Sequence, residues 1–218
     1  MSVIDQIQQS IQSAYDLDLP LKVADYLVDE ETRQSICGAQ TQLPEQFFIR
    51  EDGEHLEFAL FIHNDILKRL ENDDPFLRLH AGNFSDFCVA LEGVSHLLLT
   101  ANRANQNRSI SALEMELQAE VDKFVHAWLL LDQQGQQKHS TAKRLLSYLF
   151  TDFTLHDGLS NQEQERYHVA SINAERYCRK LTKDYQHDRN TRRIRTHTRN
   201  FFQQPLAEKL SMVATPLI

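Results

Sequence analysis

The chain has 218 residues, of which 41% are hydrophobic and 25% charged, and a formal net charge of −8. This size and composition are typical of a soluble globular protein whose core is large enough to need no disulfides. Only 6 Gly and 5 Pro occur, which argues against a turn-rich all-β fold, and the Gly-rich phosphate-binding motifs G-x-x-x-x-G-K-[ST] and G-x-G-x-x-G are absent.

The sequence shows no sign of export or of membrane insertion. No apolar run reaches the roughly 18 residues that span a bilayer. The stretch "MSVIDQIQQSIQSAYDLD" lacks the basic start and apolar segment of a secretory signal. Cys37, Cys88 and Cys178 are far apart and form no C-x-x-C pair, so we expect reduced thiols and a cytoplasmic location.

The first part of the chain predicts short helices. Apolar residues at helical spacing predict an amphipathic helix over residues 3–15. A second short helix is expected around residues 21–27, because it follows Pro20. Residues 33–45 show no hydrophobic period, and we expect a loop there.

The stretch "QFFIREDGEHLEFALFIH" predicts a β-hairpin over residues 46–63. Two runs rich in β-branched and aromatic residues flank Asp52-Gly53, a dipeptide typical of a type I′ turn. Asn64 is expected to cap a helix that stops before Pro75, since the residue before proline is pushed out of the helical region. We therefore expect an N-terminal substructure over 1–75 and a helical bundle over 76–218, which could also form one continuous domain.

The rest of the chain predicts helices with short connections, which favours antiparallel neighbours in a bundle. The first expected helix covers residues 85–103, and the second carries the apolar stripe from Ile110 to Leu131 with Ser109 or Ser111 as cap. A third covers Leu145 to Phe150, a fourth follows the Ser160–Glu163 capping box, and the last runs from Pro205 to Val213. The spacing places five apolar residues in one shared core: Leu91, Leu98, Leu117, Phe124 and Trp128. The expected fold is mainly α, α+β at the N-terminus, with one hairpin.

Two of these helices carry carboxylates and a histidine at suggestive positions. Glu92 and His96 fall on one polar stripe of an otherwise apolar helix, so they need partners inside the protein. Glu116 and Glu120 are four apart on the next helix, where two like charges are destabilising unless a cation lies between them. Glu92, His96, Glu116 and Glu120 are therefore candidate ligands of a divalent metal ion in a metal-dependent enzyme.

A purely structural interpretation explains the same residues. Glu92 and His96 can pair with each other, Arg–Glu contacts can join the helices, and Glu116 and Asp122 can face solvent. The Glu-x-x-x-His spacing occurs once and departs from the Glu-x-x-His pairs of di-iron bundles, and H-E-x-x-H is absent. No Ser or Cys lies in a recognisable nucleophile motif. The sequence alone thus favours polar helix packing over metal binding.

The segment between Arg176 and Arg199 holds nine basic and two acidic residues. Five arginines are candidate binding residues: Arg189, Arg192, Arg193, Arg195 and Arg199. The segment could bind nucleic acid, dock on acidic groups of this chain or of a partner, or form a solvated flexible linker. A pI of about 5.7 argues against a dedicated DNA-binding protein, so nucleic acid is not the favoured partner.

Four stretches, "LEGVSHLLL", "SALEMELQAEVDKF", "REDGEHLEFALFIH" and "PLAEKL", resemble a set of bacterial proteins with no assigned activity. The resemblance implies a bacterial source and no role for any residue. The expected function is a cytoplasmic interaction or regulatory protein without catalysis, which uses the basic segment and the hairpin edge to bind a protein partner or a second copy. The alternatives are the metal-dependent enzyme and a nucleic-acid-binding protein.

Overall fold

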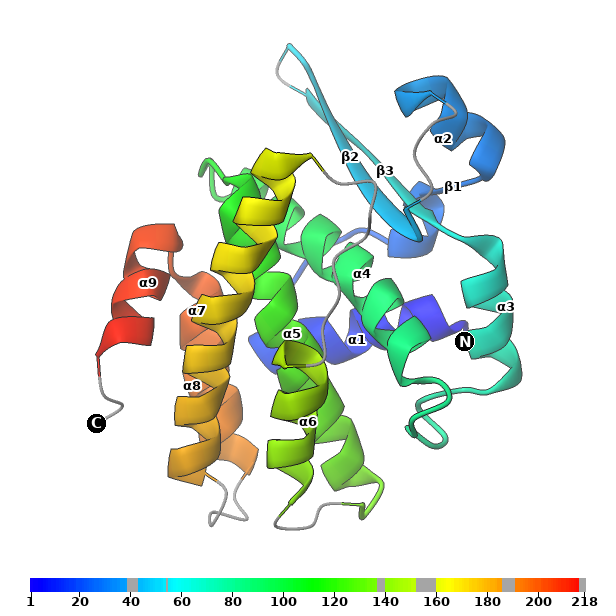
Figure 1. The fold of residues 1–218 in the computed structure, drawn as a ribbon. Coiled ribbons are helices and arrows are strands. Elements are labelled where there is room, and N and C mark those ends of the chain that lie inside the picture. The colour runs from blue at the N-terminus through cyan, green and yellow to red at the C-terminus, as the bar shows by residue number, and fades with distance from the viewer. Residues whose placement is uncertain (39–42, 54, 137–139, 152–159, 186–190, 216–218) are drawn as a thin grey trace.

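The computed structural model describes residues 1–38, 43–53, 55–136, 140–151, 160–185 and 191–215. In chain order the elements are α1 (Val3–Tyr15), η1 (Val23–Tyr26), β1 (Leu27–Val28), α2 (Glu30–Cys37), β2 (Glu45–Asp52), β3 (His55–Ile62), α3 (Asn64–Asn72), α4 (Phe84–Asn105), α5 (Ala112–Gln133), α6 (Thr141–Phe150), α7 (Asn161–Tyr185), α8 (Thr191–Gln203) and α9 (Leu206–Ala214). The fold is mainly α with a small sheet near the N-terminus, which confirms the expected fold class (Figure 1).

The centre of the molecule is formed by the consecutive helices α4 and α5, which pack on each other (Figure 1). Ser111 caps α5, because its side chain accepts a hydrogen bond from the backbone N–H of Glu114. Five residues predicted to share a core are all buried in one apolar cluster: Leu91, Leu98, Leu117, Phe124 and Trp128. Further helices enclose the pair, with α1 and α3 against α4 and with α6, α7 and α8 against α5.

Helix α4 is long and apolar enough to cross a membrane by length and composition, although no uninterrupted apolar run predicts a span. However, 72% of its apolar window is buried inside the protein. The apolar side chains of α4 thus contact neighbouring helices and strands, as those of a core helix do.

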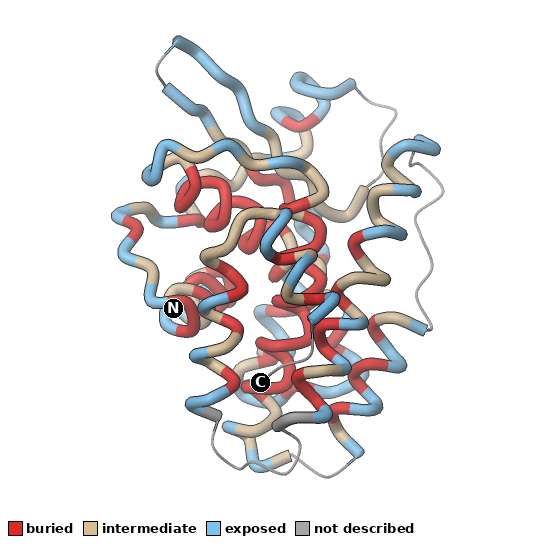
Figure 2. Tube along the Cα trace, turned by 90° about the vertical axis from the view of Figure 1, so that its left-hand side faces the viewer, coloured by how far each residue is buried: buried red, intermediate tan, exposed pale blue. Residues whose placement is uncertain are grey.

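The sheet has three strands in the order β1-β3-β2. Strands β2 and β3 form the predicted antiparallel hairpin. Asp52, which was expected in the turn, ends β2 opposite His55, and Gly53 follows it with a left-handed φ of +61°. The base of the hairpin packs on α4, whereas its distal half projects and is exposed (Figures 1 and 2). Strand β1, which the sequence did not predict, pairs in parallel with β3.

Two local predictions are wrong, and a third is confirmed only in part. Residues 30–37 form helix α2 where a loop was expected from residue 33, because Asp29 caps a helix whose Arg33 bonds back to Glu30. Around residues 21–27 only the short 3₁₀ helix η1 forms before the chain enters the sheet. His63, and not Asn64, caps α3, since its Nδ1 accepts from the backbone N–H of Asp65.

The flexible-linker interpretation of the basic segment is also wrong for residues 191–203, which form helix α8. Ile194, Thr198, Phe201 and Phe202 recur at helical spacing and are buried. The apolar cluster holds residues from before and after Pro75 and is continuous across that position. A boundary between 1–75 and 76–218 stays a prediction.

Candidate metal centre

The cluster of acidic and basic side chains between the hairpin base and helices α4 and α5 is called the carboxylate–histidine cluster. Helix α4 supplies Glu92 and His96, which are four residues apart and share one face. Helix α5 supplies Glu116, Glu120 and Lys123 in the same way. Strand β2 contributes its first residue, Glu45, because the hairpin base packs on α4. These six residues form the cluster.

His96 lies between two carboxylates. Its Nε2 is 3.5 Å from Oε2 of Glu116, and its Nδ1 is 3.8 Å from Oε1 of Glu45. Both distances exceed the usual hydrogen-bond range of about 2.7–3.2 Å. Glu45 Oε1, His96 Nε2 and Glu116 Oε2 are buried and make no hydrogen bond to the part of the chain that the structure describes. Buried polar atoms are seldom left in that state, since each costs about 1–3 kcal/mol.

The other half of the cluster is paired. Lys123 Nζ lies 2.7 Å from Oε2 of Glu92 and 2.7 Å from Oε1 of Glu120. Lys123 therefore balances the charge of Glu120, one of the two acids of α5 that were expected to repel each other. Ligand atoms of Glu92, His96 and Glu116 all lie within 4.8 Å of one another, and among the residues that the structure describes they form the group suited to a metal ion. Glu120 lies against Lys123 instead.

Burial and mutual charge shift the pKa values across the cluster. Burial raises the pKa of Glu45 and of Glu120, against the opposing effects of His96 and Lys123. Burial alone would lower the pKa of His96, but Glu116 and Glu45 together raise it well above its usual value. Likewise Glu120 and Glu92 outweigh burial and raise the pKa of Lys123. The cluster thus strongly favours a positive charge between its carboxylates.

Helix α7 adds two side chains beside the cluster. Nε of Arg166 lies 3.4 Å from Oε1 of Glu116, and its guanidinium lies 5.8 Å from the centre of the Tyr167 ring. Burial, and then the charges of Glu92 and Glu116, raise the pKa of Tyr167 above its usual value. The phenol of Tyr167 therefore stays protonated beside the acidic group.

A second buried polar region, the Asp122 network, lies on the same two helices. Asp122 accepts hydrogen bonds from the hydroxyls of Tyr15 and Ser95 and from the side-chain amide of Gln118. Lys209 Nζ from α9 donates to Oε1 of Gln118 over 2.7 Å. The carboxylate of Asp122 is thus fully hydrogen-bonded although it is buried.

The Asp122 network continues into an ion pair. Arg103 donates from Nε and Nη2 to Oε1 of Glu114, over 3.0 and 2.8 Å, and Lys209 Nζ lies 3.7 Å from the same oxygen. Arg103 also donates to the carbonyl oxygens of Phe202 and Gln204, over 2.7 Å each. These bonds hold the end of α8 against α4.

The four candidate arginines that the structure describes do not form one surface. Arg189 lies outside the described residues. Arg192 and Arg193 are exposed, Arg195 is half-buried, and Arg199 Nη1 lies 3.1 Å from Oδ2 of Asp16 after α1. Arg199 thus docks on this chain's own N-terminal part, which is one of the interpretations that the sequence left open.

Comparison with known protein families, with curated proteins and with solved structures finds no match to this chain. The resemblance to bacterial proteins therefore stays an expectation.

Proposed function

We propose that this protein binds a divalent transition-metal ion through Glu92, His96 and Glu116, and that it is a metal-dependent enzyme. One observation carries the proposal: three buried polar atoms without a hydrogen-bond partner in the described structure, Glu45 Oε1, His96 Nε2 and Glu116 Oε2, meet in one cluster. Ligand atoms about 2.1 Å from one ion at tetrahedral angles lie about 3.4 Å apart. The 3.5 Å between His96 Nε2 and Glu116 Oε2 agrees with a shared ion.

Glu45 fits the role of a positioning residue for His96. A metal-binding histidine commonly donates its second ring N–H to a carboxylate, which fixes the tautomer of the ring and its orientation. With Nε2 facing Glu116, the Nδ1–H of His96 faces Oε1 of Glu45 at 3.8 Å. A small movement of either side chain closes this hydrogen bond and satisfies the buried Glu45 oxygen.

The donor set limits the choice of metal. Two carboxylates and one imidazole suit Mn²⁺, Fe²⁺ or Zn²⁺, and they lack the thiolates that softer ions prefer. Three protein ligands leave coordination positions open, as catalytic sites do, and an ion held there would supply an activated water molecule or a polarised substrate oxygen. Lys123, Arg166 and Tyr167 are charged and hydroxyl groups that lie near the proposed ligands Glu92 and Glu116.

The competing interpretation is a proton in place of the metal. A protonated His96 would balance Glu45 and Glu116, as Lys123 balances Glu92 and Glu120. This interpretation requires both facing carboxylates to move closer to His96, since its Nε2 and Nδ1 lie 3.5 and 3.8 Å from them, whereas a metal ion accounts for the 3.5 Å separation as it stands. It also predicts no metal affinity, so one experiment separates the two interpretations.

The experiment measures metal content after purification and then titrates chelator-treated protein with Mn²⁺, Fe²⁺ and Zn²⁺. We expect about one ion per chain in the wild type and a loss of roughly 100-fold or more in affinity for Glu116→Gln, since a charged ligand is removed. Glu120→Gln is the matched control: it makes the same change one turn further along α5 and should keep the metal. An equal loss in both variants would contradict the ligand set, and a metal-free wild type that binds none of the three ions would overturn the proposal.

A second candidate function is binding of a protein partner through the hairpin. Strand β2 is an edge of the sheet, and its distal half is exposed. Ile49 and Leu56 near the turn are large apolar residues with exposed fractions of 40% and 39%. An unpaired edge of this kind can accept a strand from a partner or from a second copy. Light scattering of the wild type and of Ile49→Lys tests it, because the variant should abolish any self-association.

Nucleic-acid binding and a cytoplasmic location stay proposals. Arg192 and Arg193 are exposed, Arg199 pairs with Asp16 and Arg195 lines a pocket, so these arginines of α8 do not share one face for a nucleic acid. A salt titration with random RNA and DNA oligonucleotides tests it, since phosphate contacts weaken steeply as salt rises. The three cysteines are all free, Cys88 and Cys178 being buried and Cys37 exposed, which suits a reducing compartment.

A further inference from the structure

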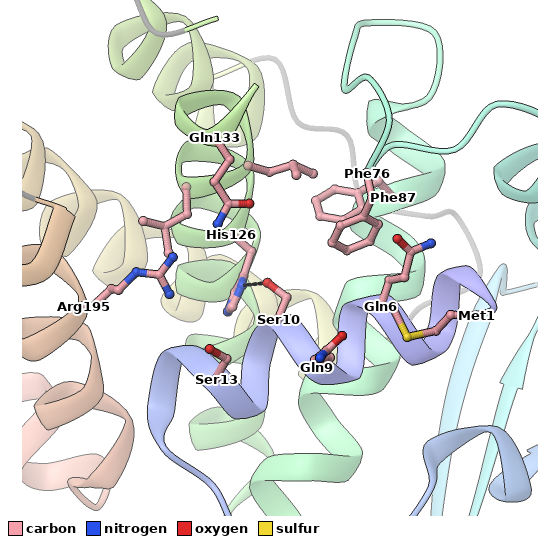
Figure 3. A pocket seen from close by; sticks show the side chains of 12 residues that line it. Met1, Gln6, Gln9, Ser10, Ser13, Phe76, Phe87, His126, Gln133 and Arg195 are labelled. Atoms are coloured by element: carbon pink, nitrogen blue, oxygen red, sulfur yellow. Dashed lines mark hydrogen bonds between the residues drawn. The ribbon is translucent and has the colours of Figure 1, made fainter. Parts of the chain in front are cut away.

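A pocket of about 250 Å³ lies between helices α1, α5 and α8, and its lining includes none of the six residues of the carboxylate–histidine cluster. Polar side chains come from all three helices, and two phenylalanines come from α4 and the loop before it (Figure 3). The lining residues are Gln6, Gln9, Ser10, Ser13, His126 and Arg195, with Met1, Phe76, Phe87, Leu129, Leu130 and Gln133. No Asp or Glu is among them.

His126 stands at the polar end of this pocket. Its side chain is buried, with an exposed fraction of 2%, and its Nδ1 lies 2.9 Å from the hydroxyl of Ser10 on α1. Its Nε2 is buried and has no hydrogen-bond partner among the described residues. Burial, and then the charge of Arg195, lower the pKa of His126 to about 3. The imidazole is therefore neutral near pH 7, and one of its nitrogens lacks a partner.

Arg195 is the charged group of the pocket. It is half-buried, and its guanidinium points from α8 toward the imidazole of His126 (Figure 3). Its neighbour on the same helix, Arg199, is paired with Asp16, whereas the guanidinium of Arg195 has no carboxylate partner within the described chain. In a protein with 31 acidic and 23 basic residues, an arginine in a pocket without acids favours an anionic ligand.

The opposite end of the pocket is apolar. Phe76 and Phe87 contact each other edge to face, with their ring centres 6.1 Å apart. They lie across the pocket from Arg195 and His126, and Gln6 lies at the same end as the phenylalanines (Figure 3). A ligand that fills the pocket therefore has one charged end and one apolar end. Arg195 is the one positively charged side chain of the lining, and one guanidinium matches one carboxylate.

We propose that this pocket binds a small monocarboxylate with an apolar tail. The planar guanidinium of Arg195 pairs with the carboxylate through two parallel hydrogen bonds. The hydroxyl of Ser10 donates to Nδ1 of His126, which fixes the tautomer and leaves Nε2–H to donate to the same carboxylate. The tail lies against Phe76 and Phe87. This site is independent of the proposed metal centre.

The first test is a calorimetric titration of the full chain with hexanoate, and with 1-hexanol and inorganic phosphate as comparators. Hexanoate should bind at one site, roughly tenfold or more tighter than either comparator, since neither has both the charge and the tail. EDTA should not change the affinity, because no metal takes part. Three results would each overturn the proposal: no saturable binding up to about 10 mM hexanoate, equal affinity for 1-hexanol or phosphate, or loss of binding with EDTA.

The second test uses two arginines of the same helix. Arg195→Met should weaken hexanoate binding about tenfold or more, because the paired guanidinium is lost. Arg199→Met, one turn further along α8 and outside the pocket, should leave it unchanged. Thermal melts establish that both arginine variants fold. Ser10→Ala is a milder change, which removes the hydroxyl bonded to His126, and it should weaken hexanoate binding several-fold. Equal affinities for wild type, Arg195→Met and Ser10→Ala would contradict the site.

Discussion

The carboxylate–histidine cluster and the Asp122 network arise from the same two helices and differ in one respect. In the Asp122 network the buried carboxylates are satisfied: three side chains donate to Asp122, and Arg103 donates twice to Glu114. In the cluster, Glu45, His96 and Glu116 each keep a buried atom without a hydrogen bond in the described structure. The carboxylates of the first region are paired within the chain, although Arg103 Nη1 there is buried without a partner among the described residues. In the second region both acids and the imidazole keep an atom without such a partner, which is the arrangement that the proposed metal ion would complete.

The two regions differ in how many basic side chains of the protein reach their acids. Arg103 and Lys209 are long side chains that reach Glu114 from α4 and α9, so the protein itself neutralises that acid. In the cluster, Lys123 pairs with Glu92 and Glu120, whereas Glu116 has long contacts to Arg166 Nε, at 3.4 Å, and to His96 Nε2, at 3.5 Å. Buried charges persist when they are paired, so the underpaired acids of the cluster support the proposed metal site.

The largest expected effect comes from breaking the complete region. Arg103→Met should lower the free energy of unfolding by about 3–5 kcal/mol, because Glu114 is left as a buried charge and two carbonyl groups lose their donor. Urea unfolding measures the loss. Arg179→Met is the control: Arg179 is 57% exposed and pairs with Glu175 on the surface of α7, so its loss should cost less than about 1 kcal/mol. A loss below about 1 kcal/mol for Arg103→Met would show that the network is not structural.

The second effect is a pH dependence that belongs to Asp122. Burial raises its pKa from 3.8 to about 6, despite the hydrogen bonds from Ser95 and Tyr15. The folded state therefore holds the proton more tightly than the unfolded state, and this group's contribution to stability falls as pH rises from about 4 to about 6. A shift of about two units corresponds to about 3 kcal/mol.

Asp122→Asn removes this titration and keeps an acceptor for Tyr15 and Gln118. The unfolding free energy of the variant minus that of the wild type should rise by about 2–3 kcal/mol between pH 4.5 and pH 7.5. The reason is that only the wild type must ionise a buried acid over this range. Urea unfolding at the two pH values gives the comparison. Parallel pH curves for the two proteins would refute the raised pKa.

The contrast between the two regions also shows how far the sequence predicts the structure. The hydrophobic periods of α4 and α5 are long and regular, and they correctly placed Leu91, Leu98 and Phe124 in one core. The stripe with Glu92 and His96 correctly indicated polar partners inside the protein. Local patterns suffice for these features because neighbouring turns of one helix determine them.

Contacts between distant segments could not be read from the sequence. Glu45 lies in a stretch without a period, and it reaches His96 only because the hairpin base packs on α4. Arg166 on α7 and the pair of Ser10 with His126 depend on helix packing in the same way. Helix α8 did carry a local signal, since Ile194 and Phe201 are seven residues apart, but the dense arginines obscured it.

The third prediction concerns stabilisation by metal in the incomplete region. At a free ion concentration of about 100 times its Kd, the wild type should gain about 2.7 kcal/mol in unfolding free energy, because the ion binds only the folded state. Glu116→Gln should gain less than about 0.5 kcal/mol under the same conditions, because a roughly 100-fold weaker affinity puts that concentration near its own Kd. Thermal melts with and without Mn²⁺ or Zn²⁺ measure the difference. A gain of the same size in Glu116→Gln would place the ion elsewhere.

The smallest expected effect tests whether Glu45 orients His96. A Cβ atom at Gly93 would lie 2.6 Å from Cδ1 of Leu60 and 2.9 Å from Oε1 of Glu45, so Gly93→Ala forces both side chains to move. We expect a loss of about 1–3 kcal/mol from overpacking. Because Glu45 leaves its place beside His96, metal affinity should also fall by about tenfold.

Gly53→Ala separates the two consequences of that change. Gly53 has a φ of +61°, and a Cβ atom added there would meet no other side chain within 4 Å, so alanine strains the hairpin turn without touching Glu45. It should cost about 1 kcal/mol and leave metal affinity unchanged. If Gly93→Ala lowers stability but binds metal as tightly as Gly53→Ala does, Glu45 has no part in orienting His96. The cluster would then depend on its three ligands alone.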